Sequence, residues 1–61
     1  MKIFYVEGYL GWFVIFARTH AAARKSGVDE YGRGLVKSVR LATLKDIDKY
    51  RNLKGDIDIA A

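Results

Sequence analysis

Hydrophobic residues are concentrated near the start of the chain, where residues 3–17 form an almost continuous apolar run. Within this run, residues 3–7 and 12–18 are rich in β-branched and aromatic side chains, which favour β-strands. Between them lies the sequence Gly8-Tyr9-Leu10-Gly11. Because glycines tolerate the positive φ that a tight turn can require, the pattern predicts a β-hairpin with its turn at these residues.

The second predicted strand is apolar on both faces. Phe13, Ile15 and Ala17 alternate with Trp12, Val14 and Phe16. Strands of this kind are typical of the interior of a sheet, so we expect residues 12–18 to form the central strand. A chain of 61 residues has little material to cover two faces. We therefore expect helices on one face of the sheet and an open second face.

The next part of the chain predicts a short helix followed by a loop. Thr19 is a suitable N-cap for a helix over residues 20–26, and Gly27 fits the left-handed position that often follows a helix. The alanines in this segment favour a helix and let it lie close to a sheet. Residues 28–34, with two glycines, two acids and Tyr31, predict a connecting loop.

The remaining pattern predicts a third strand and a second helix. Residues 35–42 alternate well enough for a strand, with Lys37 and Arg40 on opposite faces. Thr43 and Asp46 have the spacing of a capping box, and residues 44–53 have apolar side chains at helical spacing before Gly55.

These elements predict an α+β domain. The expected order is β-β-α-β-α, a small three-stranded antiparallel sheet with two helices packed on one face. Residues 56–61 alternate acid and isoleucine. They could form a short edge strand or a frayed tail, and the absence of a strand is favoured.

Length and composition limit what holds the fold together. The chain predicts a single domain over residues 1–61, with a stability on the order of a few kcal/mol. It has no cysteine, so no disulfide or thiolate metal site braces it. This fits a cytoplasmic setting. A membrane anchor over the apolar run is disfavoured, because the run contains Glu7, Gly8 and Gly11 and is shorter than the roughly 20 residues that a spanning helix needs.

No catalytic, cofactor-binding or metal-binding signature is present. The segment Gly8-Tyr9-Leu10-Gly11-Trp12 lacks the spacing of a phosphate-binding loop. The single histidine, His20, has no carboxylate or serine at a triad spacing and is expected on the surface or partly packed. We expect no enzymatic activity, no cofactor and no metal.

Charge and aromatic residues suggest a binding function. Between residues 18 and 40 six basic residues stand against two acidic ones, within a net charge of +4. An open sheet face with aromatic and basic side chains could bind a protein, a second copy of the chain or single-stranded nucleic acid. Packing of all the aromatic residues in the core is the alternative without a functional face. The candidate partner-binding residues are Tyr5, Trp12, Arg18, Arg24, Tyr31, Arg33, Lys37 and Arg40.

The strand Trp12-Phe-Val-Ile-Phe-Ala17, the Thr19-His20-Ala-Ala-Ala helix start and the segment Leu35-Val-Lys-Ser-Val-Arg-Leu41 resemble small accessory proteins encoded by phages and prophages. The resemblance rests on length and element order. It implies a non-catalytic protein that binds and inhibits a host protein or a protein–nucleic acid complex, as anti-CRISPR proteins do. The alternative is direct binding of single-stranded nucleic acid or RNA across the open sheet face.

Overall fold

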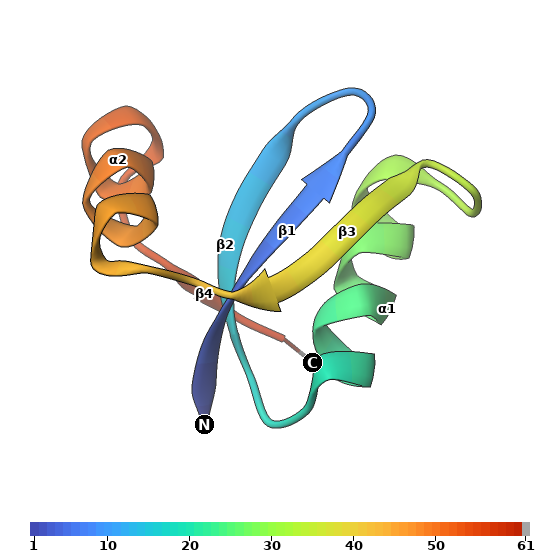
Figure 1. The fold of residues 1–61 in the computed structure, drawn as a ribbon, viewed down its shortest axis with the longest axis horizontal. Coiled ribbons are helices and arrows are strands. Elements are labelled where there is room, and N and C mark those ends of the chain that lie inside the picture. The colour runs from blue at the N-terminus through green and yellow to red at the C-terminus, as the bar shows by residue number, and fades with distance from the viewer. Residues whose placement is uncertain (61) are drawn as a thin grey trace.

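The computed structural model describes residues 1–60 and shows an α+β fold with a four-stranded mixed sheet. The elements are β1 (Lys2–Gly8), β2 (Trp12–Ala17), α1 (His20–Tyr31), β3 (Val36–Leu41), α2 (Leu44–Lys54) and β4 (Asp58–Ile59). The strand order is β3-β1-β2-β4 (Figure 1). Both strands of the hairpin are therefore interior strands.

The hairpin and its third strand follow the prediction. Strand β1 pairs antiparallel with β2 and, on its other side, antiparallel with β3. The prediction of a three-stranded, purely antiparallel sheet is wrong in one respect. A fourth strand, β4, pairs parallel with β2 through Ile15–Asp58 and Phe16–Ile59, and the Ala60 N–H donates to the Phe16 carbonyl over 2.8 Å. Residues 56–60 thus include the edge strand that the sequence analysis disfavoured, while residue 61 lies outside the described residues.

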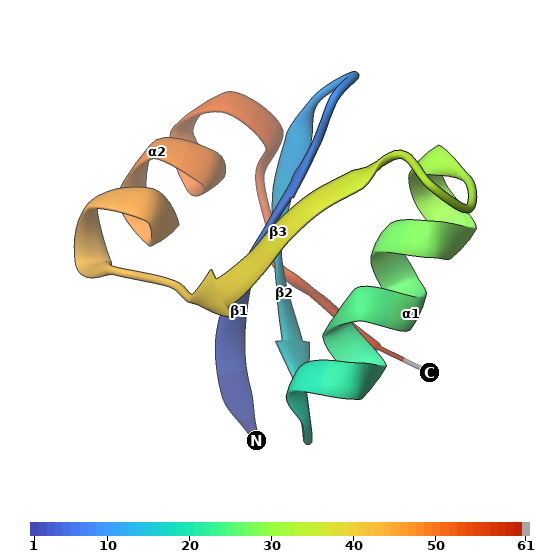
Figure 2. The same ribbon diagram turned by 45° about the vertical axis from the view of Figure 1, so that its right-hand side comes forward.

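The two helices lie on opposite faces of the sheet, which corrects the expectation that both cover one face. Figure 2 shows the sheet edge-on with α2 and α1 on either side. The core against α1 contains Phe4, Val6, Ile15, Ala17, Ala23 and Val39. On the α2 side, Val14 is 1% exposed and Trp12 contacts Tyr50. Apolar residues on both faces of β2 required cover on both faces, and 61 residues suffice for it.

Helix α1 continues through Gly27 to Tyr31, so the predicted helix end and most of the predicted loop are wrong. Gly27 is buried because the helix passes close to the sheet there. A Cβ at this position would lie 2.8 Å from Val6 Cγ1 and 3.0 Å from Val36 Cγ2. The helix ends at Gly32, which has φ +105° and donates its N–H to the Val28 carbonyl.

The hairpin glycines also serve packing more than turn geometry. Neither Gly8 nor Gly11 has a positive φ within the described chain. Instead, a Cβ at Gly8 would lie 2.6 Å from Tyr31 Cδ2, and one at Gly11 would lie 3.2 Å from the Tyr31 hydroxyl. The absence of side chains at both glycines lets the Tyr31 ring lie under the turn. This contact fixes the end of α1 against the hairpin.

Helix α2 begins as predicted. The Thr43 hydroxyl accepts from the Asp46 N–H, and the Asp46 carboxylate accepts from the Thr43 N–H, which completes a capping box. The helix ends at Gly55, with φ +94°. Only Tyr50 on this helix is buried, while Leu44 and Leu53 of the predicted apolar stripe are 80% and 66% exposed.

Candidate functional site

The face of the sheet toward α2 carries the aromatic pair that the sequence singled out. Tyr5 on β1 and Trp12 on β2 stack with ring centroids 5.6 Å apart and an interplanar angle of 21°. This distance is within the range in which aromatic pairs attract beyond their buried area. The strand register places Trp12 opposite Glu7, one alternation along from Tyr5, so the two rings meet diagonally across the hairpin.

Cations of the same chain contact the rings of this pair. The Arg40 guanidinium lies 4.1 Å from the centroid of the Tyr5 ring, and Arg40 is the register partner of Tyr5 across β1 and β3. The Lys49 ammonium lies 5.6 Å from the centroid of the Trp12 ring. Tyr50 meets Trp12 edge-on, with ring centroids 5.8 Å apart. We call Tyr5, Trp12, Arg40, Lys49 and Tyr50 the aromatic–cation stack.

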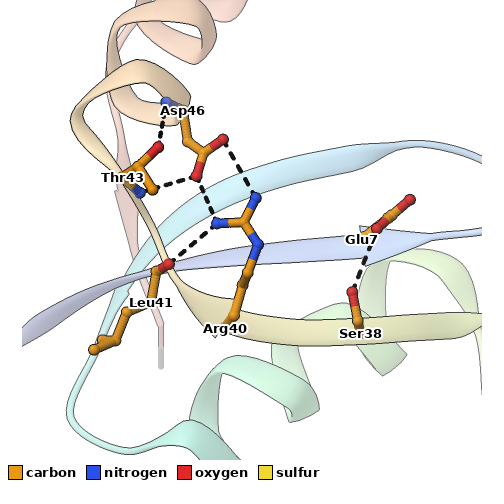
Figure 3. Close-up of polar contacts among 6 residues, drawn as sticks. All are labelled: Glu7, Ser38, Arg40, Leu41, Thr43 and Asp46. Atoms are coloured by element: carbon orange, nitrogen blue, oxygen red, sulfur yellow. Dashed lines mark hydrogen bonds and ion pairs between the residues drawn. The ribbon is translucent and has the colours of Figure 1, made fainter.

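Carboxylates neutralise the basic residues along β3. Figure 3 shows the contacts of Arg40 with Asp46 and of Ser38 with Glu7. Arg40 Nη1 lies 2.7 Å from Asp46 Oδ2, and Arg40 Nη2 lies 3.4 Å from Asp46 Oδ1. Lys37 Nζ lies 3.8 Å from Glu7 Oε2, and the Ser38 hydroxyl donates to Glu7 Oε1 over 3.3 Å. Arg40 and Lys37 therefore each have an acidic partner within the domain.

The pKa values on this face reflect the same contacts. The hydrogen bond from Arg40, followed by the Thr43 N–H, lowers the pKa of Asp46 from 3.8 to about 2. The same hydrogen bond raises the pKa of Arg40. Burial, and then the charge of Glu7, raise the pKa of the Tyr5 hydroxyl. These directions are those of an ion pair set beside an aromatic stack.

The structure brings half of the predicted binding residues together and separates the others. Tyr5, Trp12, Lys37 and Arg40 gather on the α2 face, where they mainly contact one another and nearby acids. The remaining residues lie elsewhere. Arg18 follows β2, Arg24 is exposed on α1 across the sheet, and Arg33 is exposed in the α1–β3 connection. Their predicted contacts with a partner stay predictions.

Tyr31 has a packing role. It is the last residue of α1 and lies against Gly8 and Gly11, with its ring centroid 5.8 Å from that of Phe13. The sequence analysis placed it in a loop as a contact residue. The difference follows from the continuation of α1 past Gly27, which turns Tyr31 inward.

His20 is partly packed, as expected. Its Nε2 lies 2.7 Å from the Val39 carbonyl oxygen, and its ring meets Phe4 edge-on at 5.8 Å. A carbonyl only accepts, so Nε2 carries the proton in this contact. The side chain thus joins the first turn of α1 to β3. Among residues 1–60, no three His, Cys, Asp or Glu side chains gather as a metal site would require.

The turn of the hairpin presents a surface that the sequence analysis did not single out. Tyr9 and Leu10 are 68% and 75% exposed, and Leu35 of the α1–β3 connection is 37% exposed. The Tyr9 N–H donates to the Leu35 carbonyl over 3.1 Å, so these three residues belong to one local structure. We call them the hairpin tip. A sequence signal did exist, since two large apolar residues lie in a turn where polar residues are usual.

Comparison with known protein families, with curated proteins and with solved structures found no match to this chain. The apolar run at residues 3–17 forms two strands and a turn, and so is not a continuous helix. Neither helix in the described part of the chain is long and apolar enough to span a bilayer.

Proposed function

We propose that this chain is a non-catalytic binding protein that engages another protein through its hairpin tip. The observation that carries the proposal is the exposure of Tyr9 and Leu10 at the end of a hairpin held on two sides. Large apolar side chains that a small domain leaves in water favour contact with a partner. Tyrosine in particular is enriched among the residues that contribute most to binding energy.

Several contacts hold the tip in place before any partner arrives. The Gly8 N–H donates to the Gly11 carbonyl over 2.7 Å and closes the turn. The Tyr9 N–H bonds to Leu35, and the Tyr31 ring lies against both glycines. A surface that is already ordered loses less conformational entropy on binding, so such a tip favours affinity. In Figure 1 the turn between β1 and β2 extends beyond the rest of the sheet.

The alternative, binding of single-stranded nucleic acid across the sheet, has less support. The face that would stack bases is partly covered by α2, and Arg40 lies over the Tyr5 ring. Arg40 and Lys37, which would neutralise phosphates, have carboxylate partners. A stacking platform needs open ring faces beside unpaired cations. Binding of a protein through the hairpin tip requires neither open ring faces nor unpaired cations.

The resemblance to phage-encoded accessory proteins indicates where to look for the partner. Proteins of that group act stoichiometrically on a host protein or a protein–nucleic acid complex and often inhibit it. A bacterial target, cytoplasmic and protein in nature, is therefore the first class to test. The proposal requires no catalysis and no cofactor, because binding alone would produce the effect.

The test is affinity capture from bacterial lysate with the full chain and two variants. In the first variant, Tyr9→Ser and Leu10→Ser are combined to remove the apolar tip. In the second, Leu44→Ser removes a side chain that is 80% exposed, more than either tip side chain, but lies on α2. We expect a stoichiometric partner with the unmodified chain and with L44S, and loss of at least about tenfold with Y9S/L10S, since contact side chains at binding hot spots contribute a few kcal/mol.

Two outcomes would contradict the proposal. Equal capture by all three proteins would show that the tip is not the contact surface. Recovery that disappears after nuclease treatment would favour the nucleic-acid alternative instead. Circular dichroism spectra of the variants check that each remains folded, and both substitutions lie at exposed positions where this is expected.

A further inference from the structure

A hollow in the described part of the molecule lies along the outer edge of β2. It has a volume of about 510 Å³ and is bounded by Phe13–Ile15 of β2, the last turns of α1 and α2, and β4. We call it the β2-edge cleft. Of the predicted partner-binding residues, Tyr31 alone is among its lining residues, and the hairpin tip does not include it.

The floor of the cleft is a strand edge that lacks a partner along part of its length. Strand β4 pairs only with Ile15 and Phe16 of β2 in the described residues. Backbone groups of a strand alternate in direction, and the Phe16 carbonyl points toward β4, where it accepts from Ala60. The N–H groups of Trp12 and Val14 therefore point to the same side, beyond the N-terminal end of β4, which begins at Asp58 beside Ile15. An unpaired edge of this kind can accept an added strand.

The rim of the cleft is acidic although the chain as a whole is basic. Asp29 and Glu30 in the last turn of α1, together with Asp58 on β4, line it, and Lys54 is the one basic residue among its lining residues. The last turns of α1 and α2 both border the cleft. The C-terminal end of a helix carries partial negative charge, which adds to the field of the carboxylates.

The Tyr50 side chain lines the cleft and is affected by the same negative charges. The residue is only 9% exposed, and its hydroxyl has no hydrogen-bond partner within residues 1–60. Every buried side-chain nitrogen or oxygen atom in that range has a hydrogen-bond partner. The Tyr50 hydroxyl, which has none, is therefore accessible to water on the side of the cleft that Tyr50 lines. Burial, then the charges of Asp58 and Glu30, raise the pKa of this hydroxyl. It is placed to accept a hydrogen bond from a cationic group.

We propose that the β2-edge cleft binds an extended segment of a partner protein that carries lysine or arginine. The segment would pair its backbone with the free edge at Trp12 and Val14. Its basic side chain would lie between Glu30 and Asp58, within reach of the Tyr50 hydroxyl. This proposal rests on the proposed function in that it requires a protein partner, but it uses a surface distinct from the hairpin tip.

The negative charge of the cleft favours a basic peptide over the other possible ligands. A second copy of the chain offering its own β2 edge would bring a second set of the same carboxylates against the first. Nucleic acid would be repelled by the same groups. The cleft carboxylates do not form a cluster with metal-ligand geometry among residues 1–60. An extended basic peptide satisfies both the unpaired backbone and the uncompensated charge.

The test is a titration of the isotope-labelled full chain followed by amide NMR shifts. The probe is a short capped peptide of alternating valine and lysine. The controls are the peptide with glutamate in place of lysine and a version whose backbone is N-methylated on its pairing edge. We expect the lysine peptide to move the amide signals of Trp12 and Val14 more than that of Phe13, whose N–H points toward β1. Neither control peptide should do so.

Variants separate the cleft from the rest of the surface. Glu30→Gln combined with Asp58→Asn should weaken binding of the lysine peptide about tenfold, because coupling between close charge pairs at interfaces is of that order or larger. Asp48→Asn, which removes an exposed carboxylate of α2 outside the cleft, should not change it. The tip variant Y9S/L10S should also bind the peptide normally.

The proposal is overturned if the lysine peptide moves no β2 amide up to millimolar concentration, if the glutamate peptide binds as well, or if E30Q/D58N binds unchanged while remaining folded. These failures differ from failure of the proposed function. The proposed function fails if capture of a partner from lysate does not depend on the hairpin tip, whether or not the lysine peptide binds the cleft.

Discussion

The Arg40 guanidinium and the Asp46 carboxylate are joined by two contacts, the shorter being 2.7 Å between Nη1 and Oδ2. Arg40 lies on the edge strand β3, and Asp46 lies in the first turn of α2. Asp46 also accepts from the Thr43 N–H, and Arg40 also covers the Tyr5 ring. One ion pair thus connects helix capping, strand-to-helix docking and the aromatic–cation stack.

Replacement of Asp46 tests this connection through its pH dependence. Asp46→Asn should lower the free energy of unfolding by roughly 1 kcal/mol at neutral pH, since it removes the ion pair and weakens the cap. The folded-state pKa is depressed from 3.8 to about 2, so the stabilisation is present above pH 3.8 and is lost as pH falls through about 2. Urea unfolding of both proteins across this range measures it. A difference that stays constant down to pH 2 would contradict the assignment.

Gly27→Ala tests the close approach of α1 to the sheet. The added Cβ would meet Val6 Cγ1 at 2.8 Å and Val36 Cγ2 at 3.0 Å. Alanine favours a helix over glycine by about 1 kcal/mol, and overpacking costs roughly 1–3 kcal/mol, so we expect a net loss of about 1 kcal/mol. Lys25→Ala, on the exposed side of the same helix, is the control and should change stability by less than about 0.5 kcal/mol. Stabilisation by G27A would show that the sheet yields to the extra methyl group.

Substitutions at Tyr31 separate packing from partner contact. Tyr31→Ala should destabilise the domain by roughly 2–4 kcal/mol, because its ring lies under the hairpin glycines and against Phe13. Tyr31→Phe keeps the ring and should be nearly neutral in thermal unfolding. If Y31F were fully stable yet lost the captured partner, the hydroxyl would be a contact group, and the prediction of Tyr31 as a partner-binding residue would hold.

His20 provides a test of how the start of α1 is attached. His20→Phe keeps a ring edge near Phe4 but removes the donor to the Val39 carbonyl, and should lower the unfolding free energy by about 1 kcal/mol. His20→Ala removes both contacts and should cost more. Chemical denaturation gives both values. Equal stability of H20F and the unmodified chain would mean that water replaces the donor without loss.

Binding to oligonucleotides provides the last test. The Trp12 ring contacts Tyr5, Tyr50 and Lys49, so single-stranded oligonucleotides should not quench its fluorescence by stacking. Any association should be weak and governed by net charge, with a steep dependence on salt. Quenching of the Trp12 fluorescence by oligonucleotides at low salt would instead indicate stacking on this ring. That result would support the nucleic-acid alternative. The tryptophan is unique in the chain, so the signal is unambiguous.

The sequence by itself determined the strands and the helix start that depend on interactions between residues close together in the chain. Alternation and β-branching located the hairpin strands and β3, and the Thr43–Asp46 spacing located the start of α2. Caps and alternation act within a few residues of the chain, so their effects can be read without knowledge of distant neighbours. The gathering of Tyr5, Trp12 and Arg40 on one face followed from the same alternation. Lys37, which alternation placed on the face opposite Arg40, instead meets Glu7, because the register of β1 and β3 shifts between Glu7 and Gly8.

Only the tertiary structure decided what depends on contacts between distant segments. The sequence marked Gly27 as a helix end, but the approach of Val6 and Val36 makes it an interior packing position. The placement of α2 opposite α1, the parallel pairing of β4 and the neutralisation of Arg40 likewise depend on which elements meet in space. A glycine or a charge has the same local signature in either role, and the neighbour that decides between them is supplied by the fold.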